Sequence, residues 1–162
     1  MPNRRLIALL SLVAAGAALG GAWIAETRLG LVPCALCLLE RWPFRVLLAL
    51  SALALAWPGL RRAALVAGLL SMVAGVGLGI THVGVEQHWW PSPLPECAAP
   101  PLGGGSMAER LARMPARPAK PCDEPVLLVP GVPVSFAGLQ LAVALALAGM
   151  LATSVLQTET RA

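Results

Sequence analysis

The chain has 162 residues, of which 57% are apolar and only 12% are charged, and its mean hydropathy is +0.75. Soluble domains carry about a quarter charged residues, so this composition excludes an ordinary soluble protein and indicates a membrane protein. The net charge of +4 comes from basic residues beside apolar runs, which is typical of a topology signal, and no nucleic-acid-binding pattern accompanies it.

Four apolar segments are each long enough to cross the hydrocarbon core of a lipid bilayer, which takes about 20 helical residues. They cover residues 6–25, 38–57, 63–85 and 136–156. The second segment differs from the others because it carries Glu40, Arg41 and Arg45 in its first turns, which should therefore lie near a membrane interface. Helices joined by short linkers can bury their faces only against one another. The sequence therefore predicts an all-α membrane protein, a four-transmembrane-helix bundle that forms a single domain over residues 1–162.

Basic residues beside these segments predict how the chain crosses the membrane. Arg4 and Arg5 precede the first segment, Arg61 and Arg62 separate the second from the third, and Arg161 follows the fourth. Because short basic loops stay on the cytoplasmic side, both termini should be cytoplasmic and the connections after the first and third segments should lie outside. A cleaved secretory signal at the N-terminus is the alternative, and it would move one terminus to the other side.

The outer connection over about residues 86–133 holds most of the chain's fifteen prolines, in stretches such as PSPLPEC and PARPAKPCDEP. This composition predicts an exposed, irregular loop. One short helix is expected within it, in GGGSMAERLARMP, where Ser106 and Glu109 form a capping box and Pro115 ends the helix. Its apolar side chains share one face, so the helix either lies on the membrane surface or packs against nothing.

The four cysteines, Cys34, Cys37, Cys97 and Cys122, all fall in segments expected on the outer, oxidising side of the membrane. Cys34 and Cys37 form a C-x-x-C at the head of the second segment, a spacing typical of redox-active pairs. A helix N-terminus offers free N–H groups and a partial positive charge, which lower a thiol pKa and favour the reactive thiolate. The pairing of the four cysteines stays open among three arrangements, and two redox-inert structural disulfides are the alternative.

Metal chemistry is not predicted at these cysteines. Haem attachment would require a histidine directly after the second cysteine, where Leu38 stands, and zinc would require Cys97 and Cys122 to join the C-x-x-C without a second close pair.

Arg41 and Arg45 follow Cys37 at helical spacing. Arg41 lies four residues after Cys37, which places both on one face of a continuous helix, and Arg45 lies one turn deeper. A guanidinium at this depth can counter a thiolate or donate a hydrogen bond to a ligand carbonyl, since charge within a membrane segment is by default functional. In the alternative, both arginines reach outward to lipid headgroups with Glu40 as their partner.

The stretch PCALCLLER resembles the signature of the disulfide bond formation protein B family, DsbB. A histidine near the end of the third segment, PSPLPEC, and a further loop cysteine before the fourth segment extend the resemblance over nearly the whole chain. The resemblance implies a bacterial inner-membrane enzyme that reoxidises DsbA, a periplasmic thioredoxin-fold dithiol oxidase, and passes two electrons to a membrane quinone, either ubiquinone or menaquinone.

The resemblance also implies roles for individual residues. Cys97 would form the mixed disulfide with the partner, Cys122 would then engage Cys34, and Cys37 would donate to the quinone. Arg41 matches the quinone-site arginine of the family, and His82 and His88 both compete for its histidine. Arg45 is added as a quinone contact from its helical spacing alone, and three tryptophans, Trp42, Trp89 and Trp90, are interpreted as an interfacial belt.

Two other functions stay open at this point. The first is a member of the same family that serves a different dithiol partner. The second is a non-enzymatic four-span scaffold with structural disulfides, in which Cys37→Ser would only destabilise the fold.

Overall fold

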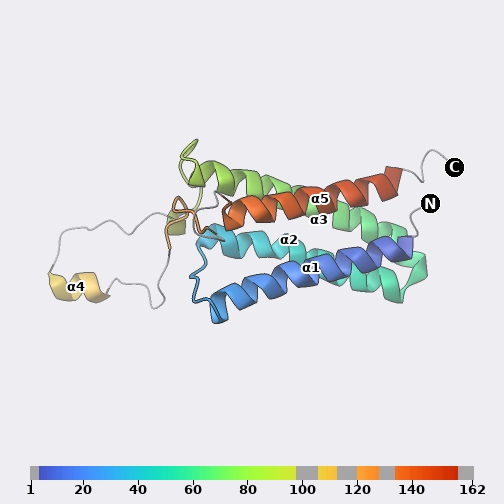
Figure 1. Cartoon of the computed structure of the whole chain (residues 1–162), viewed down its shortest axis with the longest axis horizontal. Helices are drawn as coiled ribbons and strands as arrows, with labels where there is room; N and C mark the ends of the chain where they lie inside the picture. Colours follow the sequence, from blue (N-terminus) through green and yellow to red (C-terminus); the bar gives the residue numbers. More distant parts are fainter. Residues whose placement is uncertain (1–3, 98–105, 113–119, 128–133, 157–162) are drawn as a thin grey trace.

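Four long helices lie side by side and form a bundle in the computed structural model, which describes residues 4–97, 106–112, 120–127 and 134–156 (Figure 1). They are α1 (Arg4–Thr27), α2 (Ala35–Ala56), α3 (Arg61–Glu86) and α5 (Phe136–Leu156), and the shorter pieces are η1 (Pro58–Leu60), η2 (Pro95–Cys97) and α4 (Met107–Ala112). No strand is present among the described residues, where a single β-bridge joins Leu127 to Ser135. The predicted all-α bundle with a short helix in its long connection is confirmed.

Three of these helical segments are long and apolar enough to cross a membrane: Arg4–Thr27, Pro58–Glu86 and Phe136–Leu156, as far as the described residues go. α2 is less apolar because Glu40, Arg41 and Arg45 all lie in its first half, as the sequence indicated. Large apolar side chains such as Val13 and Leu70 are more than 60% exposed on the outside of the bundle. An apolar outer surface of this kind is stable against lipid rather than water.

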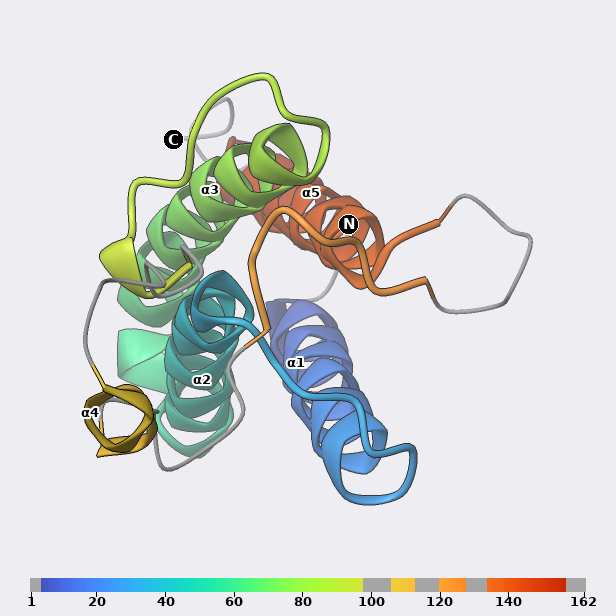
Figure 2. The same cartoon turned by 90° about the vertical axis from the view of Figure 1, so that its left-hand side faces the viewer.

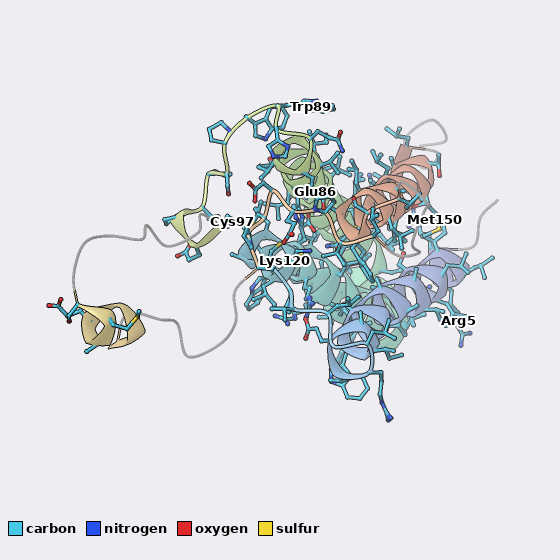
Figure 3. All side chains as sticks on the ribbon, turned by 60° about the vertical axis from the view of Figure 1, so that its left-hand side comes forward. Arg5, Glu86, Trp89, Cys97, Lys120 and Met150 are labelled. Atoms are coloured by element: carbon cyan, nitrogen blue, oxygen red, sulfur yellow. A yellow bond between two sulfur atoms is a disulfide. The ribbon has the colours of Figure 1, made fainter. Side chains whose placement is uncertain are left out.

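The two connections that carry cysteines lie at one end of the bundle, and the turn between α2 and α3 lies at the other end (Figure 1). Figure 3 shows Cys97 and Lys120 at the first end and Arg5 and Met150 toward the second. At the second end the Arg61 side chain donates a 2.9 Å hydrogen bond from Nε to the carbonyl oxygen of Ala54, near the end of α2. The fold therefore places the cysteine-bearing connections at the opposite end of the bundle from Arg61 and Arg62, which begin α3.

Small residues let α3 approach its neighbours on two faces. Ser71 Oγ donates a 3.1 Å hydrogen bond to the carbonyl oxygen of Pro43 in α2, and a Cβ added to Gly75 would lie 3.2 Å from Pro43 Cβ. On another face, a Cβ added to Gly79 would lie 3.1 Å from Leu141 of α5. Such close contacts between backbones are the usual basis of helix association in lipid. Pro43 lies inside α2 without ending it.

The end of α3 is tied to the start of α5 by a buried carboxylate. Ser135 Oγ donates a 2.6 Å hydrogen bond to Glu86 Oε2, and the same hydroxyl accepts a 3.1 Å hydrogen bond from the N–H of Gly138. The Ser135 side chain therefore caps α5 while holding it to α3. This contact fixes the two helices at the end of the bundle where the cysteines lie.

Candidate thiol redox site

Cys34 is the residue that begins α2. Its backbone is extended, and its Sγ accepts a 3.1 Å hydrogen bond from the N–H of Cys37, as a capping oxygen does at other helix starts. The Sγ atoms of Cys34 and Cys37 lie 2.7 Å apart, and neither cysteine is in a disulfide. One helical turn therefore places both sulfurs of the C-x-x-C side by side at the helix N-terminus.

The pKa of the Cys34 thiol, which lies just before α2, is lowered from the 9.0 of an ordinary thiol. The largest cause is the hydrogen bond with the Cys37 thiol, and the N–H groups of Cys37 and Leu36 act in the same direction. Burial and the negative charge of Glu40 oppose this shift. The lowered thiol pKa expected at the head of this helix is thus found at Cys34.

A titration of the reduced pair tests this assignment. In a protein with Cys97→Ser and Cys122→Ser, we expect thiolate absorbance in the ultraviolet to rise with pH and to reach the midpoint of its first step below pH 9.0. Thiolate forms as pH rises through the pKa, so a lowered pKa moves this step to lower pH. Cys37→Ala removes the largest cause and should move the step to higher pH. A step that stays in place in this variant would contradict the assignment.

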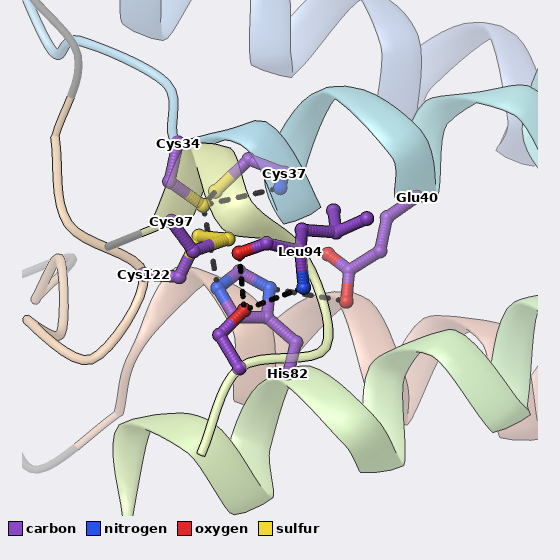
Figure 4. The surroundings of a disulfide bond; sticks show 8 residues. Cys34, Cys37, Glu40, His82, Leu94, Cys97 and Cys122 are labelled. Atoms are coloured by element: carbon purple, nitrogen blue, oxygen red, sulfur yellow. Dashed lines mark hydrogen bonds and ion pairs between the residues drawn. A yellow bond between two sulfur atoms is a disulfide. The ribbon is translucent and has the colours of Figure 1, made fainter. Parts of the chain in front are cut away.

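His82 of α3 links this sulfur pair to a buried carboxylate (Figure 4). Its Nε2 lies 3.4 Å from Cys34 Sγ, and its Nδ1 lies 3.1 Å from Glu40 Oε1. His82 and Glu40 are each 2% exposed. The Nδ1–Oε1 contact is close but does not have the direction of a hydrogen bond, so both atoms lack a hydrogen-bond partner among the described residues. A thiol, an imidazole and a carboxylate therefore stand in sequence, the order found in activated thiol nucleophiles.

The two histidines proposed from the sequence have very different surroundings. His82 is buried against the cysteines, whereas His88 is exposed just after α3 and has a positive φ of 58°. The structure places His82 beside Cys34, whereas His88 lines the surface hollow that reaches Cys97.

A cavity opens beside Cys37 between α1, α2 and α5. Its polar lining residues are Glu26, Cys37, Glu40, Arg41 and Gln140, and apolar side chains complete the wall. The cavity has a volume of about 50 Å³ and is partly open to the outside of the bundle. Arg41 pairs with Glu26 of α1 across this cavity. The structure therefore brings Arg41 to the same space as Cys37, as their spacing predicted.

A separate apolar groove lies between α1, α2 and α5. It is lined by Ala17, Ala18, Gly21, Ala22, Phe44, Phe136, Leu139, Gln140 and Val143, and it measures about 170 Å³. Ala22, Phe136 and Gln140 line both spaces. The cavity at Cys37 and this apolar groove are thus neighbours that share lining residues of α1 and α5.

Arg45 is not brought to this cavity. Its guanidinium carbon lies 5.3 Å from the ring centroid of Trp42, a cation–π arrangement, and both residues are exposed. Glu40 is not the partner of either arginine, because it faces His82, and Arg41 pairs with Glu26 instead. The alternative in which Glu40 neutralises the arginines at the headgroups is therefore not the arrangement of this structure.

The second cysteine pair is a disulfide between Cys97 and Cys122, with the Cα atoms 5.0 Å apart. The pairing that the sequence left open is thus Cys97 with Cys122 in this structure. Cys34, Cys97 and Cys122 belong to one buried cluster together with Leu36 and Val85, and Cys37 packs against it. Figure 4 shows the two pairs side by side at the head of α2.

An open hollow of about 410 Å³ reaches the second pair from outside the bundle. Its lining includes Trp90, Pro91, Leu94, Pro95 and Cys97. Cys97 therefore borders a space large enough to admit part of another molecule, although its own side chain is only 4% exposed.

Three residues of the site carried no clear signal in the sequence. Glu26 ends an apolar segment, and Gln140 is a lone amide in another, so both looked like ordinary polar residues of membrane helices. The sequence indicates Glu40 only as a partner of the two arginines, whereas the structure places it against His82. The contacts of these residues depend on how the helices pack against one another, and residue spacing within one helix does not reveal them.

A comparison with protein families matches residues 4–154 to the family model described as "Disulfide bond formation protein DsbB". No curated protein and no solved structure matches the chain significantly. The matched region contains α1, α2, α3, both cysteine pairs and nearly all of α5. A four-span membrane bundle is the fold of this family, in agreement with the helices described above. The chain belongs to the disulfide bond formation protein DsbB family.

Proposed function

We propose that this protein is a membrane thiol oxidase that reoxidises a periplasmic thioredoxin-fold dithiol oxidase of the DsbA type and passes the electrons to a membrane quinone. Family membership implies the coarser part of this statement, membrane thiol oxidation of DsbA-like partners. One observation carries the finer part. Two cysteine pairs share a buried cluster, and one pair borders an open hollow while the other borders a cavity between the long helices.

Electrons enter at the Cys97–Cys122 disulfide. A thiolate of the partner attacks Cys97 Sγ, forms a mixed disulfide and releases Cys122 as a thiolate. The Cys122 thiolate then attacks Cys34 Sγ of an oxidised C-x-x-C, so that a Cys34–Cys122 disulfide forms and Cys37 leaves as a thiolate. The second partner thiol resolves the mixed disulfide, and the freed Cys97 thiolate takes Cys122 back from Cys34. The two thiols at Cys34 and Cys37 then hold the two electrons, which leaves Cys97 and Cys122 joined again as a disulfide.

The side chains around the cavity beside Cys37 suit the ring of a quinone. Arg41 and Gln140 offer N–H donors to carbonyl oxygens, and the adjoining groove offers an apolar path of the kind an isoprenoid tail needs. Because the cavity volume is only about 50 Å³ and the cavity is partly open, a ring would lie partly outside it. The quinone, ubiquinone or menaquinone, supplies the sink for two electrons and two protons.

His82 and Glu40 handle a proton in this proposal. When Cys34 and Cys37 return to a disulfide, two thiol protons must leave a largely buried site. His82 Nε2 lies 3.4 Å from Cys34 Sγ and is the nearest base in the described part of the chain. A general base needs this kind of hydrogen-bond reach to the proton that it accepts. The Glu40 carboxylate at Nδ1 would stabilise the imidazolium that forms.

Orientation and organisation complete the proposal. We infer a bacterial inner membrane with both termini cytoplasmic and the cysteine connections periplasmic, because the short basic segments favour the cytoplasmic side. The separation of the cysteine end from the arginine turn supports this orientation (Figure 1). The chain would act as one membrane domain over residues 1–162.

Trapping the exchange between the two pairs tests this function. A protein with Cys37→Ser and Cys97→Ser keeps Cys34 and Cys122, and we expect them to form a disulfide on mild oxidation, because both lie in one buried cluster. Peptide mapping by mass spectrometry under non-reducing conditions detects the linked peptides. The matched protein with Cys34→Ser and Cys97→Ser should link far less. Absence of the Cys34–Cys122 link in a folded protein, or equal linking in the control, would contradict the relay.

A further inference from the structure

The reduced site has the atoms of a metal centre. Cys34 Sγ, Cys37 Sγ and His82 Nε2 all lie within 4.8 Å of one another. Zinc–sulfur and zinc–nitrogen bonds of about 2.3 and 2.0 Å in tetrahedral geometry place sulfur and nitrogen roughly 3.5 Å apart, and the Cys34–His82 distance is 3.4 Å. The same geometry places two sulfurs roughly 3.8 Å apart. The sulfurs, now at 2.7 Å, would separate by rotation of the Cys37 side chain.

Glu40 supplies the outer partner that histidine ligands of metals usually have. A ligating histidine commonly turns its second ring nitrogen toward a carboxylate, which fixes the ring and raises its basicity. Glu40 Oε1 lies 3.1 Å from His82 Nδ1, and both atoms are buried without a hydrogen-bond partner in the described residues. The His82 ring thus has Nδ1 toward Glu40 and Nε2 toward Cys34 Sγ.

We propose that the reduced Cys34–Cys37 pair and His82 bind a thiophilic divalent cation, Zn²⁺ or Cd²⁺. Two thiolates and one imidazole select such ions over Ca²⁺ and Mg²⁺, which require oxygen ligands. Three protein ligands leave one coordination position open, as in known zinc sites with two cysteines and one histidine. The ion has a path of entry, because Cys37 lines the open cavity. Residue spacing does not indicate this site, because its third ligand, His82, comes from another helix, α3.

Binding would arrest the protein in its reduced state. Two metal–sulfur bonds form and two thiol protons are released, while no electron moves. Sulfurs held by the ion cannot join as a disulfide, so the electrons stay on Cys34 and Cys37. The binding itself stands on the geometry above, whereas the arrest rests on the proposed function.

Zinc binding to the full chain in detergent is the experiment. In a protein with Cys97→Ser and Cys122→Ser, reduced and then freed of reductant, Zn²⁺ is titrated against a chromophoric chelator. We expect one ion per chain in the reduced protein and none in the form with a Cys34–Cys37 disulfide, which is a control without a further mutation. Glu40→Gln keeps all three ligands and should weaken the affinity by about 10–100-fold. His82→Asn should weaken it more.

Two further readouts separate the parts of the proposal. Co²⁺ in place of Zn²⁺ should give the visible spectrum of a tetrahedral thiolate site, and this spectrum should change in His82→Asn. Oxidation of the same reduced protein by quinone in a single turnover should stop with Zn²⁺ bound and resume after a chelator is added. Equal zinc affinity in reduced protein and in His82→Asn, or one ion shared by two chains, would overturn the site. Unchanged single-turnover oxidation with zinc bound would overturn the arrest. A protein that binds zinc as expected but never reduces quinone would support the zinc site and contradict the proposed function.

Discussion

Replacing Cys37 with serine is expected to reduce quinone turnover by at least about a thousandfold, because loss of a reacting nucleophile removes most of the rate enhancement of an enzyme. The bundle should still assemble, since Cys37 is not in a disulfide and packs only at the edge of the buried cluster. The Cys97–Cys122 disulfide should still oxidise one equivalent of partner dithiol. Quinone absorbance in the ultraviolet measures the first result, and a single-turnover assay of partner thiols measures the second.

Cys122→Ser is the matched comparison for this prediction. It removes the relay and leaves the C-x-x-C intact, so pre-reduced protein should still reduce one equivalent of quinone while continuous turnover stops. A folded Cys37→Ser protein with normal turnover would show that the electrons leave from another atom. If Cys37→Ser only lowered stability, the cysteines would be structural and the scaffold interpretation would stand.

Arg41→Ala is expected to raise the apparent KM for quinone roughly tenfold to hundredfold, because a hydrogen bond from a charged donor contributes about 1.5–3 kcal/mol. Arg41 lines the cavity beside Cys37, whereas the hollow at Cys97 lies on other residues. Exchange with the partner should therefore change much less. Steady-state kinetics with quinone varied, and separately with partner varied, measure the two effects.

Arg45→Ala is the internal control for this result. It removes the same kind of side chain one turn further along α2, but Arg45 is exposed against Trp42 and does not line the cavity. An exposed substitution of this kind changes a free energy by about 0.5 kcal/mol or less, so we expect a KM within about twofold of wild type. Normal quinone kinetics in Arg41→Ala, with only folding impaired, would instead mean that Arg41 serves to anchor the helix at the headgroups.

The helices of this protein were predictable because lipid imposes a simple requirement on each segment alone. In lipid, a long apolar segment has to be helical because its backbone N–H and C=O groups can form hydrogen bonds only with one another. This holds for α1, α3 and α5, whichever helices pack beside them. The capping box before α4 was equally local. The Ser106 N–H donates to Glu109 Oε2, and the Glu109 N–H donates to Ser106 Oγ. Met114 and Pro115, which the prediction included, lie outside the described residues.

The partners of the site residues were not predictable because they depend on how the helices are rotated against one another. Helical spacing correctly placed Arg41 near Cys37, since both belong to α2. The same spacing predicted Arg45 as a quinone contact, but its side chain lies over the ring of Trp42 on the outside of the bundle. Pairs that join different helices, such as Glu26 with Arg41 and Glu40 with His82, have no counterpart in any single segment. The position of His82 beside Cys34 likewise depends on the packing of α3 against α2.

The most direct test of the central claim is the stoichiometry of continuous turnover. Purified protein in detergent is supplied with an excess of a reduced DsbA-type dithiol and a quinone, and both quinone loss and partner disulfide are followed over time. We expect many turnovers, with one quinone consumed for each partner disulfide formed. Partner disulfide formed without quinone loss, or no turnover by folded protein with either ubiquinone or menaquinone, would contradict it.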